Sequence, residues 1–161
     1  MSTYPGINYF ELARELDVVS WDNYPLWRDD EGDDWVAADT AFRHDLHRGL
    51  GGGRPFLMME SSPSATNWQP VAKLRRPGVH RLTSLQAVAH GSDSVQYFQF
   101  RKGRGGFEKF HGAVVDHFAT DKTRVFQEVA ETGRLLEKLD HVTGTGVPSR
   151  VALVYDWENR W

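Results

Sequence analysis

The stretch RPFLMME at residues 54–60 is a nearly continuous apolar run that closes in a carboxylate, Glu60. A run without polar alternation is typical of a strand buried on both faces, as the strands of parallel sheets are. Helical patterns lie on both sides of it, at 35–50, where three glycines end the pattern, and at 79–89, where Gly91 would cap it. The alternation predicts right-handed βαβ crossovers around a parallel sheet.

Two more strands are expected to join this run. Residues 17–21 form a short strand-like segment that follows a helical pattern at 7–16, and residues 94–100 form a third strand. An acidic loop at 29–34 and a long polar loop at 61–77 separate these elements. The fold class that follows is α/β.

The C-terminal part adds one helix and one strand. The helix extends to Leu139 with Thr120 or Asp121 as its cap, and its apolar stripe would pack on the sheet. Residues 144–148 have the composition of a linker, and the apolar segment 151–155 predicts a strand that no following element covers. This last strand is expected to belong to a second domain.

The length of the chain bounds its architecture. A (β/α)8 barrel normally takes about 250 residues, so the 161 residues present here hold only about three of its βα units. We therefore expect a segment of a larger protein. Residues 1–143 would form the C-terminal part of a barrel, 144–148 a linker and 149–161 the start of the next domain.

The composition argues against several classes of function. The formal charge of −3 and the pI near 6.1 give no electrostatic reason to bind nucleic acid or anionic membranes. No apolar run approaches a membrane span, and the first residues lack the pattern of a secretory signal. The absence of cysteine rules out disulfides and thiolate metal sites, and it fits the cytoplasmic location that we expect. The many aromatic rings suit sugar binding, although core packing is their commoner use.

Polar clusters follow each of the three internal strands, where a (β/α)8 barrel carries its catalytic groups. They lie at 22–24, 60–63 and 101–111. A glutamate that closes an apolar strand is unusual as a core residue, because an unpaired buried carboxylate costs several kcal/mol or takes up a proton. Glu60 is therefore a candidate for chemistry, and simple exposure to water at the strand end is the alternative.

Three strings in these clusters resemble family 42 of the glycoside hydrolases, the microbial β-galactosidases. They are VVSWDNYP at 18–25, MESSPS with NWQ at 59–69, and RGGFEKFHGA at 104–113. The closing VYDWEN at 154–159 resembles the start of that family's second domain, a flavodoxin-like module used in trimer contacts. The resemblance covers essentially the whole chain in order and implies a retaining β-galactosidase built on a (β/α)8 barrel.

The resemblance also implies roles for particular residues. Glu60 matches the catalytic nucleophile at the end of the seventh barrel strand. Trp68, Glu108 and His111 match residues that hold the terminal galactose, the indole as a platform and the other two as partners for sugar hydroxyls. No cofactor and no metal are implied, and the parent enzyme is expected to be a homotrimer that acts on galactosides.

Two aromatic residues complete the implied pocket. Tyr24 and Phe98 match aromatic walls beside the galactose. Asp22 and Asn23 are signature residues to which we assign no role.

The second carboxylic acid of the reaction is missing from these strings. In a retaining mechanism one carboxylate attacks the anomeric carbon while an acid about 5 Å away protonates the departing oxygen. The resemblance places that acid on a segment that would precede residue 1. Glu108 could replace it by residue type alone, but the family pattern makes it a sugar ligand. Activity of the chain alone is thus left open, and unpaired sheet edges would favour self-association.

Three other features have ordinary explanations. The glycines at 51–53 are not followed by Gly-Lys-Ser/Thr, so a helix stop is the better interpretation than a phosphate loop. The basic tract RKGRGG at 101–106 resembles a single-stranded nucleic-acid element, but it is isolated in an acidic chain. His44 and His47 could share a metal, yet no third ligand is near in sequence, and a solvated helix face is expected.

Two alternatives to a β-galactosidase stay open. The chain could be a non-catalytic piece that binds galactosides or only self-assembles. Within the hydrolases, an α-L-arabinopyranosidase of the same barrel type is the other possibility, and aryl glycosides of the two sugars would separate them.

Overall fold

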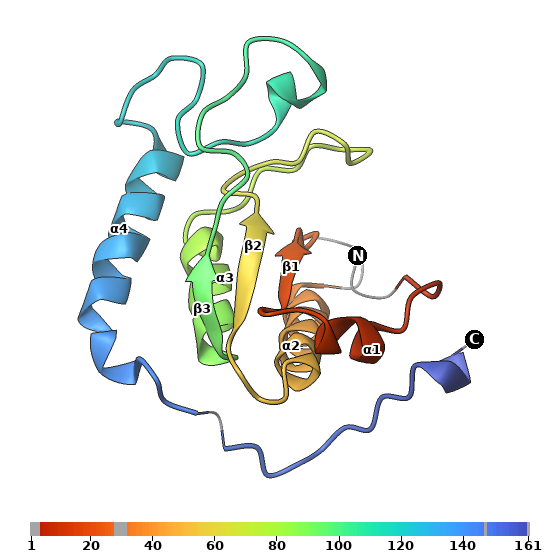
Figure 1. Ribbon diagram of the computed structural model, residues 1–161. Coiled ribbons are helices and arrows are strands. Elements are labelled where there is room, and N and C mark those ends of the chain that lie inside the picture. Colours follow the sequence, from red (N-terminus) through yellow and green to blue (C-terminus); the bar gives the residue numbers. More distant parts are fainter. Residues whose placement is uncertain (1–3, 28–31, 147, 161) are drawn as a thin grey trace.

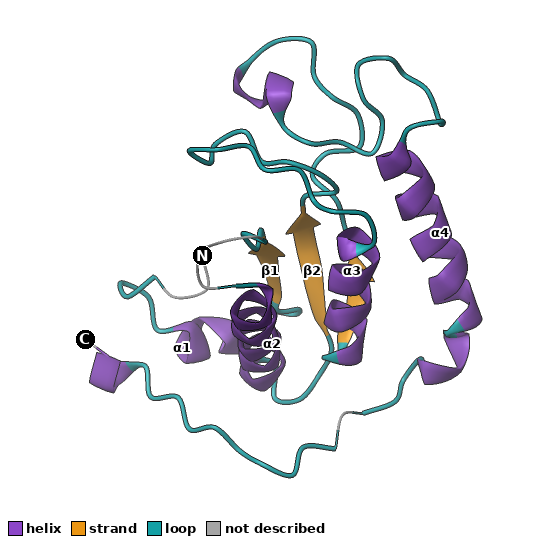
Figure 2. Cartoon of the chain, turned by 180° about the vertical axis from the view of Figure 1, so that it is seen from behind, coloured by secondary structure: helices purple, strands orange, loops and turns teal. Residues whose placement is uncertain are grey.

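The computed structural model describes residues 4–27, 32–146 and 148–160, and its centre is a three-stranded parallel sheet in the order β1-β2-β3. The strands are β1 (Ser20–Asn23), β2 (Phe56–Ser61) and β3 (Ser92–Val95). In Figure 1 the helices α2 (Asp33–Leu50) and α3 (Val79–Ala89) lie behind this sheet, and the opposite view in Figure 2 shows both in front of it. Both crossovers therefore place their helix on the same face, as successive βα units of a barrel do.

A small apolar core fixes the sheet against its helices. Phe56 of β2 is fully buried, and Val19, Trp21 and Ala13 pack in one cluster with it. Ala13 belongs to α1 (Tyr9–Arg14), the short helix that precedes β1. Burial of Trp21 leaves the alternating residue Asp22 on the other face of β1. The register of the first two strands thus follows from which side chains are apolar.

The elements predicted around the sheet are largely present, with shifted ends. α3 spans Val79–Ala89 as predicted. β1 begins three residues later than the predicted strand at 17–21, because its pairing with β2 extends from Ser20 to Asn23. Asp22 and Asn23 are therefore strand residues rather than the loop that follows a strand.

The N-terminal cap of α4 (Arg124–Lys138) differs from the prediction. Thr123 caps this helix, and its side chain accepts a hydrogen bond from the Phe126 amide at 3.2 Å. Thr123 has the extended backbone that a cap requires, with φ −71° and ψ 149°. The prediction that Thr120 or Asp121 forms the cap is therefore wrong.

The third strand is shorter than the predicted 94–100. The amide of Gln96 still donates to Met58 of β2 at 3.0 Å. The amides of the next residues donate elsewhere, that of Phe98 to Ser61 at 3.0 Å and that of Gln99 to Gly112 at 3.2 Å. Beyond Val95 the chain thus exchanges strand pairing for contacts with the loops that surround the carboxyl ends of the strands.

The strand predicted at 151–155 does not form. Val151 and Val154 are 85% and 91% exposed, and no strand lies beside them among the described residues, so the backbone has nothing to pair with. Figure 1 shows this segment passing below the sheet towards α1. There Trp157 is buried against Tyr9, with ring centroids 4.7 Å apart. Aromatic packing rather than sheet pairing holds the C-terminal segment.

Candidate active site

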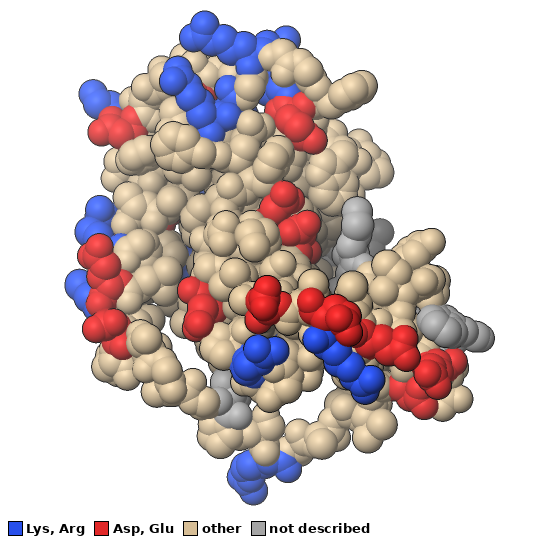
Figure 3. Space-filling view, in the orientation of Figure 1, with Lys and Arg blue, Asp and Glu red and all other residues tan. Residues whose placement is uncertain are grey.

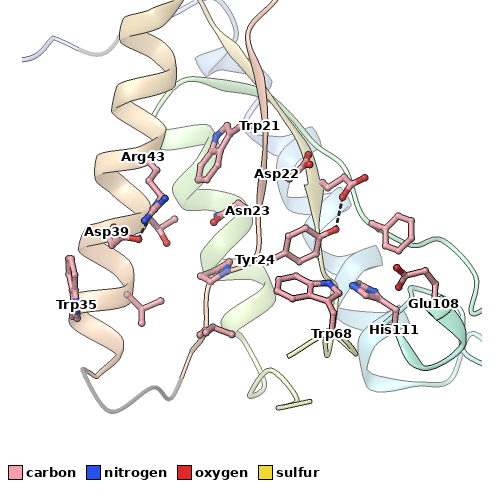
Figure 4. Close-up of a pocket in the computed structure, with 16 residues that line it drawn as sticks. Trp21, Asp22, Asn23, Tyr24, Trp35, Asp39, Arg43, Trp68, Glu108 and His111 are labelled. Atoms are coloured by element: carbon pink, nitrogen blue, oxygen red, sulfur yellow. Dashed lines mark hydrogen bonds and ion pairs between the residues drawn. The ribbon is translucent and has the colours of Figure 1, made fainter. Parts of the chain in front are cut away.

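A pocket of about 710 Å³ opens at the carboxyl ends of β1 and β2. The residues that the sequence singled out come together in its walls: they are Tyr24, Glu60, Trp68, Phe98, Glu108 and His111. Glu60 belongs to β2, and the others come from the segments that follow β1, β2 and β3. In Figure 4 the labelled side chains of Tyr24, Trp68 and His111 crowd against one another, with Glu108 beside His111. Parallel strands bring these segments together because their carboxyl ends share one edge of the sheet.

Glu60 lies near the end of β2 and is held by a phenol. The Tyr24 hydroxyl donates a hydrogen bond of 2.7 Å to Glu60 Oε2 (Figure 4). Burial raises the pKa of the Tyr24 phenol above its usual value of 10, and the hydrogen bond to Glu60 raises it further. Tyr24 therefore stays protonated at all ordinary pH values and acts as a permanent donor to the carboxylate.

Aromatic rings surround this pair. Tyr24 meets Trp68 edge to face at 5.5 Å between centroids and His111 edge to face at 5.9 Å. Phe98 approaches His111 in the same way at 5.0 Å. Trp68 remains 55% exposed, so much of its indole is free to meet a ligand. The edge-to-face contacts fix the ring orientations without filling the pocket.

His111 is almost completely buried, at 1% exposure. Its Nδ1 lies 2.9 Å from the Gly112 carbonyl, which only accepts, so Nδ1 carries the proton. Its Nε2 has no hydrogen-bond partner among the described residues. His111 lines the pocket, and its Nε2 is a buried nitrogen that makes no hydrogen bond with the described residues.

Glu108 sits on the 3-10 helix Phe107–Phe110, in the loop between β3 and α4. Two side-chain amides hold this short helix by its backbone. The Gln99 amide donates to the Glu108 carbonyl at 3.0 Å, and the Asn67 amide donates to the Phe107 carbonyl. The side chain of Glu108 is therefore presented to the pocket by contacts made through its main chain.

Asp22 places a second carboxylate near Glu60. The two residues are register partners in the pairing of β1 with β2. Burial raises the pKa of the Asp22 carboxyl above its usual 3.8, and the negative charge of Glu60 raises it further. Asp22 received no role from its place in the sequence, and its position in the structure makes it an electrostatic neighbour of Glu60.

One wall of the pocket was not predicted. Trp35, Asp39 and Arg43 project from α2, and Asp39 accepts a 2.7 Å ion-paired hydrogen bond from Arg43 (Figure 4). The i, i+4 spacing of the charged pair was visible in the sequence. Nothing in that spacing shows that this face of the helix turns towards the pocket.

The expectation of a solvated face at His44 and His47 is wrong. The two residues are 0% and 3% exposed. His47 stacks on Trp21 at 4.7 Å with an interplanar angle of 6°, and His44 stacks on Phe56 at 5.4 Å. The flat imidazoles instead fill an aromatic core, where ring stacking outweighs the polarity of their nitrogen atoms. Among the described residues no group of three or more histidine, aspartate or glutamate side chains is arranged to hold a metal ion.

The basic tract at 101–106 lies apart from the pocket lining. Figure 3 shows Lys and Arg side chains gathered at the top of the molecule, above the loop after β3, and Asp and Glu side chains at the lower right, on the α1 and α2 side. Within the part of the chain that the structure describes, no helix has the length and apolar character needed to cross a membrane.

Comparison with known proteins gives consistent results. The family model of the β-galactosidases of glycoside hydrolase family 42 matches residues 1–139. The β-galactosidase Pbg of Clostridium perfringens is 62% identical over all of this chain and 23% of its own length, and BglY of Alicyclobacillus acidocaldarius is 56% identical over the same shares.

Solved structures agree with these relatives. The cold-adapted β-galactosidase of Rahnella sp. R3 superposes with a TM-score of 0.96 at 56% identity, over all of this chain and 24% of that one. The β-galactosidase of Bacillus circulans superposes with a TM-score of 0.89 at 49% identity, over 98% of this chain and 23% of that one. The chain thus spans about a quarter of the length of the relatives that it matches.

Proposed function

Since the chain belongs to glycoside hydrolase family 42, we propose that it carries the nucleophile half of the active site of a retaining β-galactosidase. Glu60 is the proposed nucleophile. One observation carries the proposal: the 2.7 Å hydrogen bond from Tyr24 to Glu60, inside a pocket that Trp68, Glu108 and His111 also line. A carboxylate held by a permanent donor beside an exposed indole suits attack on a bound sugar.

The proposed reaction begins with the attack of Glu60 on the anomeric carbon of a terminal β-galactosyl residue. With Oε2 held by the Tyr24 hydroxyl, Oε1 is the oxygen that attacks. The bond to the leaving oxygen breaks as a second carboxylic acid protonates it, and a galactosyl ester forms on Glu60. Water, activated by the same second residue, then releases galactose with its anomeric configuration retained.

The sugar is proposed to lie on the face of Trp68, whose indole can meet the C–H face of galactose. His111 Nε2 would accept a hydrogen bond from one sugar hydroxyl, and the Glu108 carboxylate would accept from others. Buried polar groups of this kind discriminate strongly, because a sugar that lacks the matching hydroxyl leaves them unpaired.

The second carboxylic acid is proposed to come from the remainder of a longer enzyme. The match to about a quarter of each relative supports this, as do the outer edges of β1 and β3, which have no strand partner among the described residues. Residues 1–143 would be the last βα units of a (β/α)8 barrel, 144–148 a linker, and 149–161 the start of a flavodoxin-like domain. A homotrimeric parent in the cytoplasm completes the proposal.

The proposal can be tested in a chimera in which this chain replaces the matching segment of the Clostridium perfringens relative, to which it is 62% identical. We expect the chimera to hydrolyse an aryl β-galactoside. Glu60→Gln should lower kcat by at least about a thousandfold, as loss of a nucleophile does in other enzymes. Glu131→Gln, on the exposed side of α4, is the matched control and should leave kcat unchanged.

The alternatives give different results. An inactive chimera that still binds galactose would support the non-catalytic function, and the 161-residue chain alone should then bind galactose with similar affinity. A higher kcat/KM for the aryl α-L-arabinopyranoside than for the aryl galactoside would assign the chain to the other activity. Full activity in the Glu60→Gln chimera would refute Glu60 as nucleophile.

A further inference from the structure

Two loops at the edge of the pocket approach each other unusually closely at Gly112. The Gly112 amide donates a hydrogen bond of 2.6 Å to the Ala65 carbonyl. A Cβ atom on Gly112 would lie 2.7 Å from Ala65 O, 2.8 Å from Ala65 N and 2.9 Å from Ser64 Cβ. Two of these atoms belong to the backbone and cannot swing away, so the space here admits only glycine.

The backbone conformation does not explain this glycine. Gly112 is absent from the described residues with a positive φ, unlike Gly106 (φ 78°) in the same loop. Gly112 does not have the left-handed conformation that favours glycine, so the contacts with Ala65 and Ser64 are what exclude a side chain. The requirement therefore comes from the distance between the two loops.

One side of the contact is rigidly tied to the end of β2. Ser62 is 1% exposed, and its hydroxyl donates to the Ala65 carbonyl at 3.2 Å and accepts from the Ser64 amide at 3.2 Å. This closed turn begins two residues after Glu60. The position of Ala65 is thus fixed relative to the proposed nucleophile.

The other side of the contact is tied to His111. The Gly112 carbonyl accepts one hydrogen bond from His111 Nδ1 at 2.9 Å and a second from the backbone amide of Gln99 at 3.2 Å. The first of these bonds sets both the rotation of the imidazole and its tautomer, which leaves Nε2 as an acceptor. Nε2 is buried without a partner among the described residues and belongs to a ring that lines the pocket, so a ligand hydroxyl is the donor that we expect to pair with it.

We propose that Gly112 is a positioning residue, whose close contact with Ala65 sets His111 Nε2 at a fixed distance from Glu60 to accept a hydrogen bond from a galactose hydroxyl. This inference rests on the proposed β-galactosidase function and concerns how one residue of the same site is held in place. Gly112 itself touches no substrate and acts through the imidazole of His111.

The test uses the Clostridium chimera with this full chain in place. In Gly112→Ala, the added methyl group must move by roughly 0.5 Å or more to reach ordinary contact with Ala65, which displaces His111. Because misplacement by about 1 Å can cost a hundredfold in rate, we expect kcat/KM for the aryl galactoside to fall by roughly 10- to 100-fold. Gly105→Ala is the matched control, since nothing lies within 4 Å of its Cβ position and it belongs to the same loop.

A thermodynamic cycle distinguishes positioning from general damage. In a His111→Ala background, Gly112→Ala should lower kcat/KM by less than about threefold, because the group that it acts through is gone. If Gly112→Ala prevents folding, Ser62→Ala loosens the same contact without adding atoms, and its effect should show the same dependence on His111.

The outcomes separate this inference from the function on which it rests. An inactive unsubstituted chimera, or one that remains active with Glu60→Gln, would refute the proposed function. A Glu60-dependent chimera in which Gly112→Ala matches Gly105→Ala would overturn the positioning role. Equal losses with and without the His111 imidazole, for Gly112→Ala or for Ser62→Ala in its place, would overturn it as well.

Discussion

Acidification should destabilise the packing of α2 on the sheet, because two of its histidines are buried as neutral imidazoles. Burial, reinforced by the nearby charges of His90 and His47, lowers the pKa of His44 from 6.5 to about 3. Burial likewise lowers the pKa of His47 from 6.5 to about 4. Protonation would place a positive charge between aromatic rings, where little water can solvate it.

Whether stability rises or falls with pH depends on the pH at which the folded and the unfolded chain each bind protons. Above pH 6.5 both histidines are neutral in the folded and in the unfolded chain, so the free energy of unfolding does not change. Below pH 6.5 the unfolded chain takes up protons first, and stability falls until the pH reaches about 4 for His47 and about 3 for His44. Each histidine contributes about 1.4 kcal/mol per pH unit, hence about 2 kcal/mol between pH 8 and pH 5, and about 4 kcal/mol for the pair.

Urea unfolding followed by far-UV circular dichroism at pH 8, 6 and 5 measures this loss. His44→Phe keeps a flat ring beside Phe56 and cannot titrate, so it should remove about a third of the pH dependence, because His47 and His80, whose pKa values burial also lowers to about 4, supply the rest. His141→Gln, at an exposed histidine, should leave the full dependence in place. An identical slope in the wild-type chain and in His44→Phe would refute the assignment of acid sensitivity to the buried histidines.

Three substitutions test other parts of the account. Tyr24→Phe removes a hydrogen bond to a charged acceptor, worth about 1.5–3 kcal/mol, and should slow galactosyl transfer to Glu60 by roughly 10- to 100-fold; an unchanged rate would show that the phenol does not hold the carboxylate. Trp68→Ala should weaken galactose binding by about 1–2 kcal/mol in titration calorimetry, because the platform is lost, and unchanged affinity would place the sugar elsewhere. Thr123→Ala should lower the free energy of unfolding by about 1 kcal/mol, whereas Thr120→Ala should change it by less than about 0.5 kcal/mol; equal losses would contradict the observed cap.

The end of β2 could be predicted from the sequence to within one residue because its signals are local. The run that closes at Glu60 has no polar alternation, and polar side chains follow it directly. Parallel strands place such ends along one edge, so the convergence of Tyr24, Glu60 and His111 in one pocket follows from the order of the elements.

Features that depend on packing between elements could not be predicted. The faces that α2 turns to the pocket and to the core are set by contacts with β1 and β2, so Arg43 and His44 gave no usable signal. The apolar pattern at 151–155 gave a clear strand signal, but a strand also requires a neighbour. The need for glycine at 112 appears only when the turn at 62–65 is brought beside it.

The central claim is that Glu60 is the nucleophile, and covalent labelling tests it most directly. The chimera is incubated with 2-deoxy-2-fluoro-β-D-galactosyl fluoride, because the fluoride leaves without help from an acid and the fluorosugar ester is slow to hydrolyse. Peptide mass spectrometry should then find one fluorogalactosyl group, attached to Glu60. A label on Glu108 or on another carboxylate, or no label on a chimera that binds galactose, would contradict the account.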